Sequence, residues 1–65
     1  MKRSKLINYL TMYGCYLKRE GRSHSIWINP TNGVTETIPR HNEIHDLLVK
    51  KIIKNLELPK MKWFF

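Results

Sequence analysis

The chain has 65 residues, close to the lower limit for a single domain that folds without disulfides or a bound metal. Hydrophobic residues make up 42% of it, with two Trp, three Tyr and two Phe, which argues against a disordered chain. The formal net charge of +7 favours a polyanionic partner: nucleic acid first, an acidic protein second and an anionic membrane surface third, against the alternative of a merely soluble basic domain.

A first helix is predicted over SKLINYLTMYG, residues 4–14. Apolar side chains recur there at helical spacing, at Leu6, Ile7, Leu10 and Tyr13. Ser4 is the expected N-cap, and Gly14 is the expected left-handed residue that ends the helix. The basic N-terminal stretch has no apolar run long enough for a signal peptide or a membrane span, so we expect a cytoplasmic protein without a membrane partner.

Three short strands follow the helix. CYLKRE, residues 15–20, alternates in polarity and predicts a strand with one half-buried face, on which Cys15, Leu17 and Arg19 share a parity. We interpret the only cysteine as a small buried hydrophobe in a reduced setting, not as a nucleophile. HSIWIN (24–29) and VTETIP (34–39) are the other strands, and the turn PTNG between them completes an antiparallel meander.

The alternation in residues 24–29 assigns side chains to two faces. His24, Ile26 and Ile28 share one side, which we expect to face the helices. Trp27 points the other way, and two interpretations stay open. It lies on the open face, where it would stack on a base or contact a protein partner, or it belongs to the core.

A second helix is predicted from about Asp46 to Leu56, after the polar loop RHNE and before Pro59. His41 and His45 lie four residues apart but precede this helix, and without a third ligand they do not make a metal site. Residues 59–65 are expected to form a short basic, aromatic tail. The element order is then α-β-β-β-α: an α+β fold in which two helices cover one face of a three-stranded antiparallel sheet.

His24 is the strongest candidate for chemistry, because the chain has no phosphate-binding glycine loop, metal-ligand cysteine set or nucleophile elbow. Its turn, GRSH, carries Arg22 and Ser23, and Lys18 and Arg19 precede it. An imidazole can exchange a proton near neutral pH, and neighbouring cations can stabilise charge on a phosphate, as RNA hydrolysis requires. From the residues alone, a strand-end histidine without a catalytic role remains the favoured alternative.

The element order, together with the G-x-S-H turn before the second strand, resembles the HicA (YcfA-like) family. The resemblance runs from about Ser4 to Leu56 and includes SKLINYLTMYGCYLKREGRSH, HSIWINP and VTETIP. It implies a fold related to the double-stranded-RNA-binding domain, an mRNA-interferase toxin of a type II toxin–antitoxin system, and a HicB-type antitoxin that covers the site. In that family the histidine of this turn is catalytic, which implies His24 here.

The sequence also departs from that family's pattern. Ser23 and Ser25 stand where many members have a glycine before the histidine and a second histidine after it. The pair Leu47-Leu48 replaces a glycine-threonine pair at the start of the last helix, and a glycine common at that helix's end is replaced around Glu57. These departures concern the docking of the last helix more than His24.

We therefore expect residues 1–58 to form a metal-independent, cofactor-free ribonuclease domain that acts on mRNA through His24 and is monomeric or weakly dimeric. The expected RNA contacts are Lys2, Arg3, Lys5, Arg22, Ser23, Lys50, Lys51 and Lys54. Two alternatives are a catalytically silent RNA- or DNA-binding module of the same fold and a small basic domain that docks an acidic protein.

Overall fold

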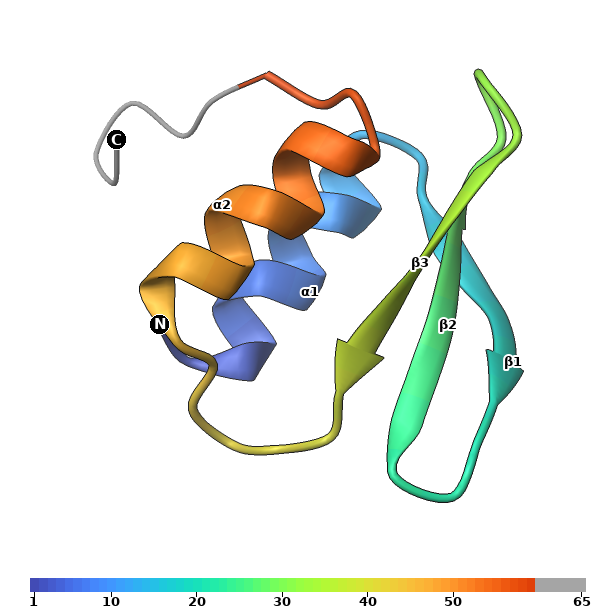
Figure 1. Cartoon of the computed structure of the whole chain (residues 1–65). Helices are drawn as coiled ribbons and strands as arrows, with labels where there is room; N and C mark the ends of the chain where they lie inside the picture. Colours follow the sequence, from blue (N-terminus) through green and yellow to red (C-terminus); the bar gives the residue numbers. More distant parts are fainter. Residues whose placement is uncertain (60–65) are drawn as a thin grey trace.

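The computed structural model describes residues 1–59 as two helices and three strands in the predicted order (Figure 1). The elements are α1 (Arg3–Met12), β1 (Tyr16–Glu20), β2 (His24–Asn29), β3 (Val34–Pro39) and α2 (Asp46–Asn55). The α-β-β-β-α prediction is confirmed. The tail expected from residue 59 onwards lies outside the described residues, apart from Pro59.

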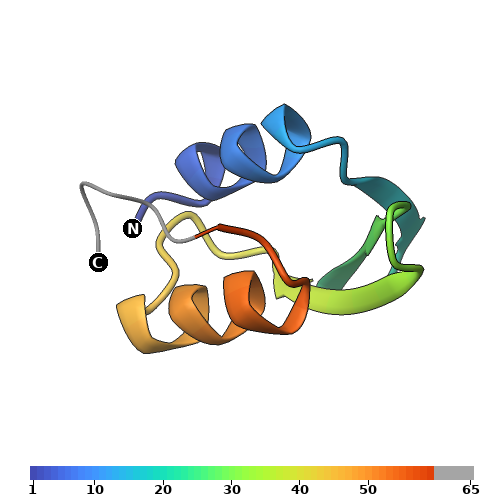
Figure 2. The ribbon, with the colours of Figure 1, turned by 90° about the horizontal axis from the view of Figure 1, so that it is seen from above.

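The strands form one antiparallel sheet in the order β1-β2-β3, and both helices lie on the same side of it (Figure 2). The core fills the space between these layers. It consists of Leu6, Tyr9, Leu10, Cys15, Ile38, Ile44, Val49, Ile52, Ile53 and Leu56. Most of these side chains come from the helices, which supply a continuous apolar stripe, whereas the sheet presents few apolar side chains to the core.

The end of α1 follows the predicted pattern, and its start does not. Gly14 adopts a φ of 86°, and Cys15 N donates to Leu10 O at 3.0 Å, which closes the helix in a Schellman motif. The helix begins at Arg3, with Lys2 as N-cap and no side-chain capping bond, so the prediction of a Ser4 cap is wrong. A side-chain cap is replaced by tertiary pairing: Arg3 N donates to Asn42 O at 2.8 Å.

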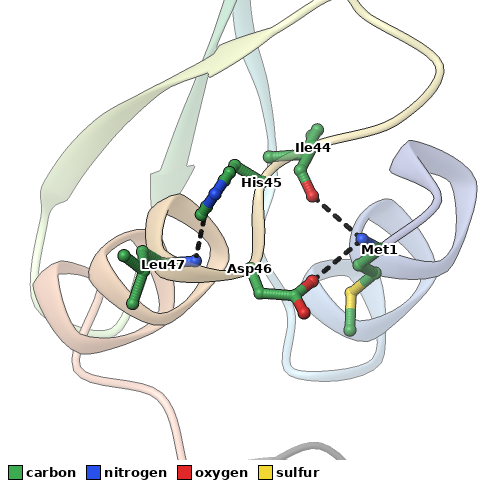
Figure 3. Close-up of polar contacts among 5 residues, drawn as sticks. All are labelled: Met1, Ile44, His45, Asp46 and Leu47. Carbon is green, nitrogen blue, oxygen red and sulfur yellow. Dashed lines mark hydrogen bonds and ion pairs between the residues drawn. The ribbon is translucent and has the colours of Figure 1, made fainter.

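The first residues of the chain pair with the segment that precedes α2 (Figure 3). The Met1 ammonium group donates to Ile44 O at 2.9 Å and to Asp46 Oδ1 at 3.1 Å, and Ile44 N donates back to Met1 O. His45 is the N-cap of α2, where its Nδ1 accepts from Leu47 N at 3.2 Å. These contacts hold the N-termini of the two helices together.

The predicted faces of β2 are reversed in the structure. Ser25, Trp27 and Asn29 point toward the helices. His24, Ile26 and Ile28 point away from them, so the expectation that this second set faces the helices is wrong. Alternation in sequence separates two sets of side chains but does not say which set is covered. The polar set is covered here because Ser25 and Asn29 both find hydrogen-bond partners.

Trp27 accordingly lies on the helix side and packs against the core, so the core interpretation holds and the one on the open face is wrong. Its Nε1 is buried and has no partner among the described residues.

The C-terminus of α2 is bound by side chains from β2 and the β2–β3 turn and is closed by a residue with a positive φ. Asn29 Nδ2 and Asn32 Nδ2 donate to Leu56 O at 2.8 and 3.2 Å. Glu57 then adopts a φ of 59°, and Leu58 N donates to Ile53 O at 3.0 Å. The helix therefore ends at a left-handed residue, two positions before Pro59.

No helix within residues 1–59 is long and apolar enough to cross a membrane.

Candidate active site around His24

His24 is the first residue of β2, where it pairs with Pro39 of β3. Its side chain is exposed and points away from the helices, and no residue in the described part of the chain hydrogen-bonds to its imidazole. The other two histidines differ. His45 uses its Nδ1 as a helix cap, and His41 lies exposed in the loop before α2. His24 is thus a solvent-facing imidazole on a regular strand.

The turn before His24 is held by backbone contacts. Gly21 N donates to His24 O at 2.7 Å, and a Cβ placed on Gly21 would lie only 2.9 Å from that oxygen. Arg40, the residue directly after β3, holds the turn, since its Nη1 donates to Gly21 O at 3.0 Å and its backbone N donates to Ser23 O at 3.2 Å. A glycine is needed at position 21 because of this close approach, and the approach sets the position of His24.

A polar network lies directly beneath this turn. Ser25 is fully buried, with 0% exposure, and its Oγ accepts from Arg3 Nη2 at 3.0 Å and donates to Glu20 Oε1. Arg3 Nε also donates to Pro39 O at 2.9 Å, opposite His24 in the sheet. Two donors of the Arg3 guanidinium are therefore engaged inside the protein. This network ties α1 to all three strands at the end of the sheet that carries His24.

A bulge in β1 changes which of its side chains face outward. The pairing with β2 skips one residue between Leu17 and Arg19, so Lys18 is the extra residue. Beyond the bulge the parity of the strand is inverted, and Glu20, opposite Ser25, faces the helices while Arg19 faces outward. The expected half-buried face is absent, because every residue of β1 is exposed.

The open face of the sheet, opposite the helices, is here called the outer face. It is formed by His24, Ile26 and Ile28 from β2, Tyr16 and Arg19 from β1, and Thr35, Thr37 and Pro39 from β3. Both carboxylates of the sheet, Glu20 and Glu36, are paired with helix-facing residues of β2. Within the described residues, this face presents Arg19 and an imidazole and no carboxylate, and Lys18 of the bulge borders it beside Arg19.

The residues expected to contact RNA are spread over one end of the molecule and one helix. The turn residues Arg22 and Ser23 lie exposed beside His24, and Lys2 and Lys5 lie exposed at the start of α1. Lys50, Lys51 and Lys54 are exposed along α2, whose ten residues span about 15 Å, so Lys54 lies far from the helix N-termini. Their contacts with RNA stay a prediction.

Cys15 is buried, as expected for a small hydrophobe, with 3% exposure. Burial raises the pKa of its thiol above the usual value of 9.0, because the thiolate would lose its hydration. Such a thiol is a weak nucleophile. It lies just before β1 and belongs to the same core cluster as Leu10, which is a structural role.

Arg40, Ser25 and Glu20 belong to the surroundings of His24, and the residue pattern did not single them out. Arg40 is distant in sequence from the turn it braces, and no local signal reports such a bond. Ser25 and Glu20 meet only because the bulge shifts the register between them.

This arrangement can be compared with known families. The model of the family described as "HicA toxin of bacterial toxin-antitoxin" matches residues 3–58, which is nearly the whole chain. The chain belongs to the HicA toxin family. Neither the curated proteins nor the solved structures contain a match. The family match makes the chain a toxin of a toxin–antitoxin system and confirms the resemblance that its turn and element order indicated.

Proposed function

We propose that this HicA-family protein is an mRNA endoribonuclease in which His24 is the catalytic acid and base. The observation that carries the proposal is the position of His24: an exposed imidazole without a structural role, held on a braced turn beside several cations. The two other histidines are a helix cap and a loop residue, so neither competes for this role.

The reaction would be an intramolecular transfer at the phosphate. The His24 imidazole takes the proton of the ribose 2′-OH, and the 2′-oxygen attacks phosphorus. The bond from phosphorus to the 5′-oxygen then breaks, and the imidazolium returns a proton to that oxygen, which leaves a 2′,3′-cyclic phosphate and a 5′-hydroxyl. No metal is needed for these steps. Arg22 would stabilise the charge that builds on the phosphate oxygens.

The RNA would be positioned by the cations at the same end of the molecule. Lys2 and Lys5 at the start of α1 and Arg22 in the turn are exposed and would contact phosphates. Arg3 donates to Ser25 Oγ and Pro39 O. The exposed lysines of α2, Lys50, Lys51 and Lys54, would add to the attraction.

A HicB-type antitoxin would neutralise the protein by covering His24. A toxin of a toxin–antitoxin system requires an antitoxin, and a chain with a net charge of +7 favours an acidic one. Copurification with the acidic product of an adjacent reading frame, lost at high salt, tests this part of the proposal.

The catalytic part is tested by His24→Ala. We expect cleavage of RNA by the purified variant to fall at least about a hundredfold, within the range for loss of a general acid–base group. His41→Ala is the matched control, since it removes the same side chain from an exposed loop. Thermal unfolding of both variants checks that the fold is intact. Cleavage by a folded His24→Ala protein at the wild-type rate would show that the chain is a silent RNA-binding module or that another group is catalytic.

A further inference from the structure

The outer face of the sheet has the composition of a binding surface and differs from an ordinary polar surface that only contacts solvent. Tyr16 is 54% exposed there, and Ile26 and Ile28 are half-buried on this face, which the helices do not cover. Lys18, Arg19, Ile26 and Thr35 line a shallow hollow of about 380 Å³ on this face. A flat aromatic ring, aliphatic side chains and cations therefore meet on a surface without carboxylates.

The bulge at Lys18 creates this arrangement. Without it, strand alternation would place Lys18 and Glu20 outward and Arg19 inward. With it, both Lys18 and Arg19 border the hollow, and Glu20 is withdrawn to Ser25 on the other side. Bulges often redirect side chains in this manner beside functional sites. The chain thus concentrates positive charge on the same face as His24.

We propose that the outer face binds single-stranded RNA next to the scissile phosphate. A strand whose phosphate lies at His24 would run along β2, with its phosphates on Arg19 and Lys18 and a base stacked on Tyr16. From His24 to Ile28, opposite Tyr16, the face extends about 13 Å along β2. The inference rests on the proposed ribonuclease function and adds a substrate class to it: unpaired nucleotides.

Single-stranded RNA fits this face better than the two obvious alternatives. In duplex RNA the base faces are stacked on each other and cannot reach Tyr16, whereas in a single strand every base offers a face to an aromatic ring. An acidic protein, including the antitoxin proposed to cover His24, would also satisfy Lys18 and Arg19, but its carboxylates would make no use of the exposed Tyr16 ring, on which a base can stack.

Binding is measured with the full chain carrying His24→Ala, so that the RNA is not cut. Fluorescence anisotropy compares a short single-stranded oligoribonucleotide with a duplex of the same sequence. On this background, Tyr16→Ala should weaken single-strand binding about tenfold, in the range for loss of one stacked base, and change duplex binding less than twofold. Met12→Ala, at an exposed apolar residue of α1, is the control for Tyr16 and should change neither.

A second comparison asks whether the position of a positive charge matters for RNA binding when the net charge is changed equally. Arg19→Ala and Lys51→Ala each remove one positive charge, but Lys51 belongs to α2, which lies on the other side of the sheet from the outer face (Figure 2). Arg19→Ala should weaken single-strand binding several-fold more than Lys51→Ala. The proposal is overturned if Arg19→Ala and Lys51→Ala weaken single-strand binding equally, if Tyr16→Ala leaves it unchanged, or if Tyr16→Ala weakens duplex binding to the same extent. It is also overturned if the Tyr16 and Arg19 variants lose binding to polyglutamate, a substitute for an acidic protein, and keep their affinity for RNA.

The two proposals can fail separately. If cleavage survives His24→Ala while Tyr16→Ala still weakens single-strand binding, the catalytic proposal is wrong and the outer face is a binding site. If cleavage is lost with His24→Ala but Tyr16→Ala binds and cleaves as the parent does, only the inference on the outer face is wrong.

Discussion

Replacing Glu57 by glycine should stabilise the protein, because Glu57 closes α2 with a φ of 59°. A residue with a Cβ in the left-handed region loses about 1–2 kcal/mol relative to its preferred conformations. The closing bonds themselves, from Glu57 N to Lys54 O and from Leu58 N to Ile53 O, both 3.0 Å long, involve only backbone atoms and would be kept by glycine. Relief of the strain is therefore the main effect.

The stabilisation expected from Glu57→Gly is partly offset by an effect on the unfolded chain. Glycine is more flexible than glutamate in the unfolded chain, which offsets about 0.5–1 kcal/mol. We expect a net increase of about 0.5–1 kcal/mol in the free energy of unfolding. For a domain of this size, each kcal/mol corresponds to about 4–8 °C in Tm, so Tm should rise by roughly 2–8 °C. Urea denaturation gives the free energy, and thermal unfolding checks the shift.

A charge effect must be separated from the backbone effect. Glu57 follows the C-terminus of α2, where a negative charge is unfavourable to the helix dipole by a few tenths of a kcal/mol. Glu57→Gln removes this charge and keeps the Cβ, so it should recover little of the gain. If Glu57→Gln is as stable as Glu57→Gly, or if Glu57→Gly is no more stable than the parent, the strain argument is refuted.

Three further perturbations test the site and the core. Gly21→Ala should lower RNA cleavage roughly tenfold or more while the protein still folds, because the new Cβ displaces His24 O; wild-type kinetics would contradict this. Asn29→Ala should lower the free energy of unfolding, measured with urea, by about 1–3 kcal/mol, because the buried amide that donates to Leu56 O is lost. A larger decrease in Asn32→Ala, which removes the longer bond to the same oxygen, would contradict this. Cys15 should react with iodoacetamide only slowly at neutral pH until urea unfolds the chain. Because its pKa is higher folded than unfolded, the free energy of unfolding should decrease as pH rises above the usual thiol pKa, and rapid alkylation of the folded protein would disprove this burial effect.

The element order and most element bounds could be predicted from the sequence alone. The strands 24–29 and 34–39 and the start of α2 at Asp46 agree with the structure to the residue. These segments carry strong local signals, namely β-branched runs, an Asn-Gly turn and helical apolar spacing. Gly14 ends α1 as expected, because a positive φ is favoured by glycine and disfavoured by other residues.

The start of α1 could not be predicted in the same way. Ser4 has the chemistry of an N-cap, but the donor that needs capping, Arg3 N, finds Asn42 O instead. That partner is distant in the chain, so no local pattern reports it. The same holds for the Arg3 side chain, whose internal bonds to Ser25 Oγ and Pro39 O were not visible in a run of basic residues.

By itself, the sequence determined the family, the order of the elements and His24 as the candidate for chemistry, because all three depend on local patterns and their spacing. Only the tertiary structure determines which face of the sheet the helices cover. Alternation in β2 is equally consistent with either side being covered, and the helices cover the side on which Ser25 and Asn29 find partners. The bulge at Lys18 then turned Arg19 outward beside His24, a change that only the pairing of two strands can define.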